Sequence, residues 1–562
     1  SNFRAGVNAG ISIASGGNYN VTVGDEAGTA ITTGDLHTFI GYGAGDAVTT
    51  EATGLTAVGA NALTSNTSGT DNLAIGVSAL EDCTEGIGNI AVGRYAAADI
   101  VDADGNVAIG AFDGTVQPAM RLNTKSHDNV AIGAGALADH NLTDNSSGFN
   151  TAVGYAAGNA VSTGVQNTLI GGLAGDALTT GASNVAVGYH ALSSEDVGKF
   201  NVAIGEGSLA SQNNSSTDIF NTAVGYSAGN AVSTGVQNTI IGAYSGDAIT
   251  TGDQNVSMGM YSLSQNTASN KNVGLGYAAL SAFNVTTDTD TYNVAVGSGA
   301  GAAVTSGIYN TLIGGLAGDA LTDADNNVAI GTSALTTDTL GSNSVAIGSD
   351  ALGAQNFTTA ASSYNVAVGS SAGLSVTTGT ANTLIGGLAG DALTTGASNV
   401  AVGYGTLGLN VLGSKSTAIG VEALARQNPA TAVDMFNVAI GIDAGYSVTT
   451  GVQNTLVGAN AGDAITEGSY NTFLGYNTGT DVVNLTTGIG NVLIGFKVET
   501  TAVDSDKAMG LGYNLNCDGG YTTLGDGATD IRAAHGNVTW ATVSDERYKK
   551  DIVDSTAGLS FI

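Results

Sequence analysis

The chain has 562 residues, with 85 glycines, two prolines and a formal charge of −33 from 14 Lys and Arg against 47 Asp and Glu. This acidity opposes binding to nucleic acid and to anionic lipid, and we expect no membrane insertion because no run of about 20 apolar residues is present. The glycines follow no G-X-Y period and 43% of the residues are hydrophobic, which argues against collagen and against a disordered chain.

Residues 1–19 form a glycine-rich lead-in with loose patterning. The motif N-x-x-[I/V/L]-G begins at Asn20 and recurs in related forms until the pattern weakens and ends near Gly525. Most steps are about 17 residues long, and self-similarity at a short fixed period is typical of a solenoid. We therefore assign residues 20–525 to one β-solenoid shaft.

A second period appears from residue 150 to about 507. Three steps of the basic length alternate with a longer one, so that four turns make a block of roughly 72 residues. We call each block a cassette; the five cassettes begin at Asn150, Asn221, Asn293, Asn365 and Asn437. An aromatic residue precedes each of them: Phe149, Phe220, Tyr292, Tyr364 and Phe436. The longer step predicts a bump that recurs along one side.

Each motif predicts a short strand whose first and third residues after the asparagine share one face and whose second residue lies on the other. Both faces are mostly apolar, and strands that are apolar on both sides are usually covered on both sides. A single solenoid covers only one face. The sequence therefore predicts an all-β, parallel β-solenoid or β-roll of roughly 17-residue turns that forms an intertwined or side-by-side homotrimer, on the order of 130 Å long.

Two roles are open for the motif asparagine. Asparagines of successive turns could stack as an amide ladder, or each could be a turn residue that tolerates the left-handed conformation. Both roles are structural. Cys83 and Cys517 lie more than twenty repeats apart, so we expect no disulfide within the chain.

Repeated Gly-Asp-Ala corners carry a set of aspartates whose stacked carboxylates could bind Ca²⁺: Asp46, Asp176, Asp247, Asp319, Asp391 and Asp463. They occur once in several turns, and we favour solvated turn residues. The five histidines have no metal-ligand spacing. We expect no metal, no cofactor and no enzyme activity in the shaft. Thr-Thr-Gly corners such as Thr179-Thr180-Gly181 suggest an ice-binding solenoid only as a distant third function, because adjacent threonines point to opposite faces.

The motif N-V-A-I-G at Asn106, Asn129 and Asn201 resembles the repeat of YadA-type trimeric adhesin heads, which are left-handed parallel β-rolls. This resemblance covers most of residues 20–525 and implies a trimer. The heads of that family generally have shorter turns.

Residues 526–543 leave the period and form a transition. From Ser544, the sequence S-D-E-R-Y-K-K-D-I resembles the start of the intramolecular chaperone domain of phage tail fibres and endosialidase tailspikes. In that family the domain trimerises the fibre and then cleaves itself off beside the serine. The resemblance implies that Ser544 is the nucleophile and Lys549 its general base, which is reasonable chemistry for a desolvated lysine. We expect residues 544–562 to be the truncated start of this domain, because the family domain usually continues for much longer.

These features favour a phage tail fibre or receptor-binding shaft in the virion, extracellular, which is trimerised and matured by a self-cleaving chaperone. Its expected partners are its own copies, other tail proteins and a host cell-surface receptor, either a glycan or an outer-membrane component. The alternative is the head of a bacterial trimeric autotransporter-like surface adhesin.

Overall fold

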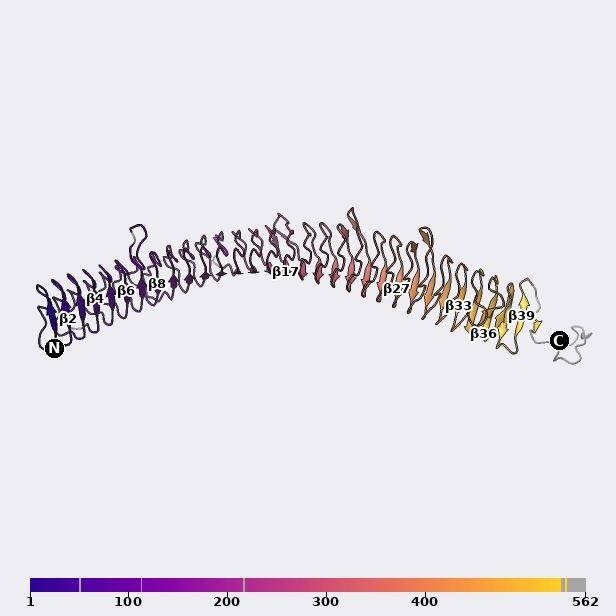
Figure 1. The fold of residues 1–562 in the computed structure, drawn as a ribbon, viewed down its shortest axis with the longest axis horizontal. Coiled ribbons are helices and arrows are strands. Elements are labelled where there is room, and N and C mark those ends of the chain that lie inside the picture. Colours follow the sequence, from indigo (N-terminus) through magenta and orange to yellow (C-terminus); the bar gives the residue numbers. More distant parts are fainter. Residues whose placement is uncertain (50–51, 113, 216–217, 537–540, 543–562) are drawn as a thin grey trace, which may run out of the picture. The chain divides into compact units, whose positions relative to one another are not determined.

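The computed structural model describes residues 1–49, 52–112, 114–215, 218–536 and 541–542. The chain divides into two compact units, Ser1–Gly299 and Ala300–Ile562, and each is a stack of turns with one short strand per turn (Figure 1). The secondary structure of the described residues is entirely β. Within these ranges we find no helix with the length and hydrophobicity needed to span a bilayer.

In the first unit, one strand per turn builds a parallel sheet. Its strands are β1 (Phe3–Ala5), β2 (Val21–Val23), β3 (Thr38–Ile40), β4 (Thr56–Val58), β5 (Leu73–Ile75), β6 (Ile90–Val92), β7 (Val107–Ile109), β8 (Val130–Ile132), β9 (Thr151–Val153), β10 (Thr168–Ile170), β11 (Val185–Val187), β12 (Val202–Ile204), β13 (Thr222–Val224), β14 (Thr239–Ile241), β15 (Val256–Met258), β17 (Val273–Leu275) and β19 (Val294–Val296). Two shorter strands, β16 (Ser269–Asn270) and β18 (Thr289–Asp290), lie outside that sheet.

The second unit repeats this arrangement. Its sheet contains β20 (Thr311–Ile313), β21 (Val328–Ile330), β23 (Val345–Ile347), β25 (Val366–Val368), β26 (Thr383–Ile385), β27 (Val400–Val402), β29 (Thr417–Ile419), β31 (Val438–Ile440), β32 (Thr455–Val457), β33 (Thr472–Leu474), β34 (Val492–Phe496), β36 (Met509–Tyr513), β38 (Tyr521–Gly525), β39 (Ile531–Ala534) and β40 (Ala541–Thr542). The short strands are β22 (Gly341–Ser342), β24 (Ala361–Ser362), β28 (Gly413–Ser414), β30 (Val433–Asp434), β35 (Glu499–Thr500) and β37 (Asn516–Cys517).

The register confirms the predicted parallel solenoid and the spacing of its turns. Thr168 of β10 pairs with Val185 of β11, and β11 pairs in the same way with β12. Pairing also extends into the lead-in, where β1 lies parallel to β2. The parallel order ends after β38, because β39 and β40 are antiparallel.

The longer step of a cassette is absorbed by a loop that pairs with the preceding turn. In three cassettes the loop carries a two-residue strand parallel to one in that turn, as in the pairs β16–β18, β22–β24 and β28–β30. The main strands on either side of the loop keep their register, since Val273 pairs directly with Val294. The extra residues therefore form the predicted bump without disturbing the sheet.

The middle residue of each strand fills the interior. A second position further along the turn compensates for its size, being small where the middle residue is large and large where it is small. In the second turn of the first cassette, Leu169 is fully buried and Gly175 leaves room for it, because a Cβ on Gly175 would lie 2.8 Å from the Leu169 side chain. In the third turn the order is reversed: Ala186 is small and Leu192 is buried, with a backbone φ of 55°. Complementary volumes keep the narrow core close-packed.

The glycine that ends each motif is required by the close stacking of turns. Gly171 has a φ of +136°, and a Cβ at this position would lie 2.4 Å from the carbonyl oxygen of Gly188 in the next turn. Only glycine adopts this backbone conformation without a steric penalty. The motif glycine is thus fixed by sterics at a strand end.

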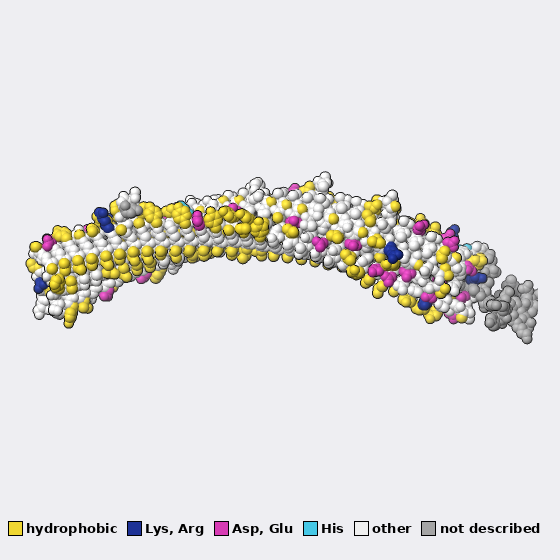
Figure 2. All heavy atoms as spheres, viewed as in Figure 1, with side chains coloured by type: hydrophobic (Ala, Val, Ile, Leu, Met, Phe, Trp, Pro, Cys, Tyr) yellow, Lys and Arg dark blue, Asp and Glu magenta, His cyan; other side chains and the backbone are white. Residues whose placement is uncertain are grey.

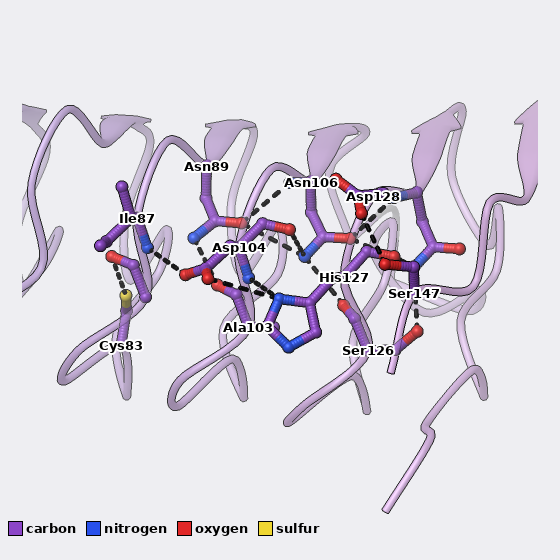
Figure 3. A network of polar contacts seen from close by, with 12 residues as sticks. Cys83, Ile87, Asn89, Ala103, Asp104, Asn106, Ser126, His127, Asp128 and Ser147 are labelled. Carbon is purple, nitrogen blue, oxygen red and sulfur yellow. Dashed lines mark hydrogen bonds and ion pairs between the residues drawn. The ribbon is translucent and has the colours of Figure 1, made fainter. Parts of the chain in front are cut away.

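The motif asparagines form an amide ladder that runs from turn to turn. Asn106 donates a bond from its backbone N–H, at 3.0 Å, and one from Nδ2, at 3.2 Å, to Oδ1 of Asn89 (Figure 3). Its Oδ1 accepts the same pair of bonds from Asn129. The ladder interpretation is therefore correct within one chain. The left-handed conformation falls instead on the residue before the asparagine, as at Gln166 with a φ of 60°.

The interior also contains polar side chains at the third and fourth turns of a cassette. Glu195 is fully buried and accepts a hydrogen bond from the Gly198 backbone at 2.7 Å and one from Gln212 at 2.8 Å. Gln212 accepts a bond from the ladder residue Asn221 at 2.8 Å. Asp338, Gln355 and Asn365 repeat this chain of contacts in a later cassette.

Both cysteines are free and buried. Burial raises the pKa of the Cys83 thiol to about 11 and that of Cys517 to about 12. Neither thiol forms the reactive thiolate at neutral pH.

The ladder makes a prediction about stability. Asn399 donates two bonds to Oδ1 of Asn382 and one from Nδ2 to the Gly413 carbonyl at 3.0 Å, and its Oδ1 accepts from the Ser416 backbone. Asn399→Ala leaves buried groups of both neighbouring turns unpaired and should cost about 2–4 kcal/mol. We expect a clear fall in Tm by circular dichroism. Thr395→Ala, at an exposed residue of the preceding turn, is the control. Equal Tm values for the two variants would contradict a stabilising ladder.

Candidate interaction surfaces

The outward side of the main strands forms an uncharged and largely apolar surface in each unit. We define the outer face as the first and third residues of the main-sheet strands. In β10 these are Thr168 and Ile170, which flank the fully buried Leu169, and Ile170 is 39% exposed. Leu474 of β33 reaches 47%. The sequence predicts that both strand faces are covered, and the structure shows that the first and third residues form the face that is open to solvent in one chain.

The composition of the outer face is uniform. In each described main-sheet strand from β2 to β34, the third residue is Val, Ile, Leu or Met, and the first residue is Thr, Val, Leu or Ile. None of these positions carries a charge, although the chain as a whole is rich in acidic residues. Rows of hydrophobic side chains run along the visible surface of the first unit (Figure 2).

The outer face is large compared with apolar patches on ordinary monomers. Strands lie about 4.8 Å apart, and the first and third residues of a strand lie about 7 Å apart, so the strip between the two columns from β2 to β19 covers on the order of 500 Å². Contiguous exposed apolar patches on soluble monomers rarely exceed a few hundred Å² and usually mark an interaction site. This surface is therefore a candidate protein–protein interface.

The aromatic residues that open the cassettes extend this surface. Each of the five lies two residues before the first outer-face residue of its strand, and all five are exposed, from 47% for Phe436 to 63% for Tyr364. Phe220 stacks on Phe200 with 5.0 Å between ring centroids. The Lys271 ammonium lies 5.3 Å from the ring centroid of Tyr292. These rings border the apolar columns where a cassette begins.

The corner aspartates do not come together as a metal site. Burial raises the pKa of Asp46, Asp176, Asp247, Asp391 and Asp463 above its ordinary value. The sixth, Asp319, accepts a hydrogen bond from the Thr336 hydroxyl. Within the described ranges, no three His, Cys, Asp or Glu side chains are arranged to share a cation.

In the Thr-Thr-Gly corners, the hydroxyl of the first threonine donates a hydrogen bond to the next turn. Thr250 Oγ1 donates to the carbonyl of Thr267 at 3.0 Å, and Thr394 Oγ1 to that of Val411 at 3.1 Å. These hydroxyls form a second ladder between turns. They are committed to carbonyl oxygens, which weakens the argument for threonine ranks that bind ice.

The candidate cleavage residues Ser544 and Lys549 lie outside the described residues.

Histidines are dispersed, and two of them are buried in the interior. His37 takes the place of a ladder asparagine, donating its backbone N–H to Asn20 Oδ1 at 2.9 Å, and His140 contacts Ser126 Oγ at 2.8 Å. Burial lowers the pKa of both imidazoles to about 4.

Comparisons with protein-family models, with curated proteins and with solved structures found no match for this chain.

The raised pKa of the corner aspartates predicts a pH effect. A carboxyl whose pKa is higher in the folded state stabilises the fold fully below its unfolded value, 3.8 for Asp247, and this stability is lost as pH rises through the folded value. At neutral pH the ionised, partly buried Asp247 is unfavourable. We expect Asp247→Asn to raise Tm at pH 7.

The Tm gain of Asp247→Asn should shrink as pH falls from 7 through the raised folded pKa of Asp247, and it should be gone below 3.8. Thermal melts of wild type and variant over this pH range measure it. Asp144→Asn, at an exposed aspartate, is the matched control. A Tm difference that does not depend on pH would show that the charge of Asp247 is not responsible.

Proposed function

We propose that this chain is the shaft of a homotrimeric fibre, which serves in host attachment as part of a phage tail. The observation that carries the proposal is the outer face: an uncharged apolar surface on a chain with a net charge of −33. Exposed apolar area of this size favours association. Another copy of the chain is the natural partner, because it presents the same columns at the same repeat spacing.

The number of copies rests on the sequence resemblances. Both YadA-type heads and fibres with an intramolecular chaperone are trimers, and three copies around an axis can turn all three outer faces inward. The mechanism of such a shaft is mechanical, since it holds receptor-contacting surfaces away from the particle. Its partners would be other tail proteins and a host surface receptor.

A bacterial adhesin head remains the alternative, because the same face would serve its trimer. The resemblance of residues 544–552 to the fibre chaperone favours the phage assignment. The gene neighbourhood tests this choice: tail-module genes beside this one support a fibre, and an encoded outer-membrane anchor in the same chain would overturn it.

The trimer makes a prediction about mass. Multi-angle light scattering of the purified chain should give three times the 55.1 kDa of a single chain. The pair Ile170→Glu and Ile204→Glu places two charges on the outer face, where both side chains are exposed in one chain. Because burying unpaired charge is costly, we expect this variant to fold with an unchanged circular dichroism spectrum and to dissociate.

Thr163→Glu with Thr180→Glu is the control, since these exposed residues lie away from the outer face and should leave the trimer intact. If the wild type is monomeric, the proposal that copies associate through the outer face is wrong. A stable dimer would refute three-fold assembly and leave pairing of the faces intact.

Maturation makes a separate prediction. When the chain is expressed with a complete downstream chaperone domain, wild type should be cut beside Ser544 into two bands on a denaturing gel. Ser544→Ala should give one uncut band because the nucleophile is gone, and Lys549→Ala should be cut much more slowly. Equal processing of wild type and both variants would rule out the assigned roles.

A further inference from the structure

The second unit contains a hollow of about 360 Å³ on the arc that follows the strands. Four successive turns, those that carry β26, β27, β29 and β31, contribute its walls. The polar and aromatic lining consists of Asp391, Tyr404, Glu422, Arg426 and Tyr446. A volume of this size is within the usual range of small-molecule sites.

Two glycines form the floor of the hollow. Gly405 has a φ of +62°, and a Cβ there would lie 3.5 Å from the Glu422 side chain. A Cβ on Gly408 would lie 3.0 Å from the Gly405 carbonyl oxygen and 3.5 Å from Asp391. The space exists because Gly405 and Gly408 have no side chains, whereas the neighbouring turns carry the charged side chains of Asp391 and Glu422.

The side chains of the hollow combine aromatic and hydrogen-bonding groups. Tyr404 is 54% exposed. The Arg426 guanidinium lies 4.7 Å from the ring centroid of Tyr446 and donates to the Tyr446 hydroxyl at 3.3 Å. Among the described residues Arg426 forms no ion pair, so most of its five donors remain available.

A second hollow of about 230 Å³ continues the first, because Glu422 and Tyr446 line both. It adds Asp443 and Asp463, so four carboxyl groups face one guanidinium along the pair. Burial raises the pKa of Asp391 and Asp463, as expected for carboxyls that water only partly reaches. Acidic side chains also gather on the visible surface of this unit (Figure 2).

The lining departs from the repeat. The residues equivalent to Arg426 in the three preceding cassettes are small and uncharged: Ser211, Ala282 and Ala354. Those equivalent to Tyr446, at the start of the following cassette, are Asn230, Ala302 and Leu374. The solenoid folds with any of these residues, so its stacking does not require Arg426 or Tyr446.

We propose that this pair of hollows binds a short stretch of a neutral glycan. A sugar ring presents an apolar C–H face, which packs on a tyrosine ring, and hydroxyls that both donate and accept. Carboxylates accept from adjacent hydroxyls, and the planar guanidinium donates to them. This inference deepens the proposed attachment function and rests on it, since it supplies the receptor class and the surface that binds it.

The charges of the lining select among ligands. Four carboxyl groups against one guanidinium repel sialic acids, uronic acids and phosphates. Tyrosines beside carboxylates can also bind an organic cation, but Arg426 already lies over the Tyr446 ring and repels a second positive charge. The hydroxyls of a neutral saccharide can accept from the guanidinium of Arg426 and donate to the carboxylates of the lining.

The test is direct binding of the full chain to an array of neutral oligosaccharides of hexoses and N-acetylhexosamines, with sialylated counterparts on the same array. Neutral glycans that bind are then measured in solution by saturation-transfer NMR. We expect neutral glycans to bind, with sialylation weakening them. Tyr404→Ala and Arg426→Ala should each weaken binding by about tenfold.

Tyr189→Ala is the matched control, because Tyr189 occupies the equivalent turn position in the first cassette and is also 54% exposed. It should bind like wild type. Absence of any neutral ligand, a preference for sialylated glycans, or equal loss in the control would each overturn the site. None of these outcomes alters the mass of the assembly, so failure of the glycan site is distinguishable from failure of the fibre.

Discussion

The fold depends on the short distance between successive turns. Strands pair about 4.8 Å apart, so the polar groups that one turn buries are within reach of partners in the neighbouring turns. The asparagine ladder meets this requirement at one edge of the strand, where Asn106 bonds to Asn89 and accepts from Asn129. The hydroxyl of Thr250 does so at a distant corner by bonding to Thr267. The same spacing requires glycine wherever carbonyls of successive turns nearly touch, as at Gly171.

Much of this architecture could be predicted because it repeats. The motif identified the strands and their register, and the longer step identified the loops. Because both strand faces are apolar, the sequence did not show that the middle residue is the one that points into the interior. The sequence alone could not decide whether the motif asparagine forms a ladder or is a turn residue, because asparagine suits both roles. The left-handed residue proved to be the one before it, and bulky side chains such as Phe149, with a φ of 50°, give no sign of that conformation in the sequence. The tertiary context of the turn overrides the local preference there.

The polar side chains of the interior cannot be recognised in the sequence. Glu195 and Gln212 look like surface loop residues, since an acidic side chain is rarely fully buried. They are tolerated because each fills a place that apolar residues fill in other turns, and because Gly198 and Asn221 satisfy their oxygens. We infer that such contacts favour one stacking register, because sliding by one turn would place Glu195 against an apolar neighbour and leave a buried charge unpaired.

Repetition also separates structure from function in this chain. A residue that recurs in every turn is explained by stacking, whether it is the ladder asparagine or the motif glycine. The outer face recurs in the same way without contributing to the interior of its own turn, and this is the basis for our proposal that a second copy with the same period covers it. The hollow lined by Arg426 and Tyr446 occurs at positions where other cassettes carry small or uncharged residues. The repeat does not require this feature, and its side chains can complement a ligand, which is why we propose it as the recognition site of this chain.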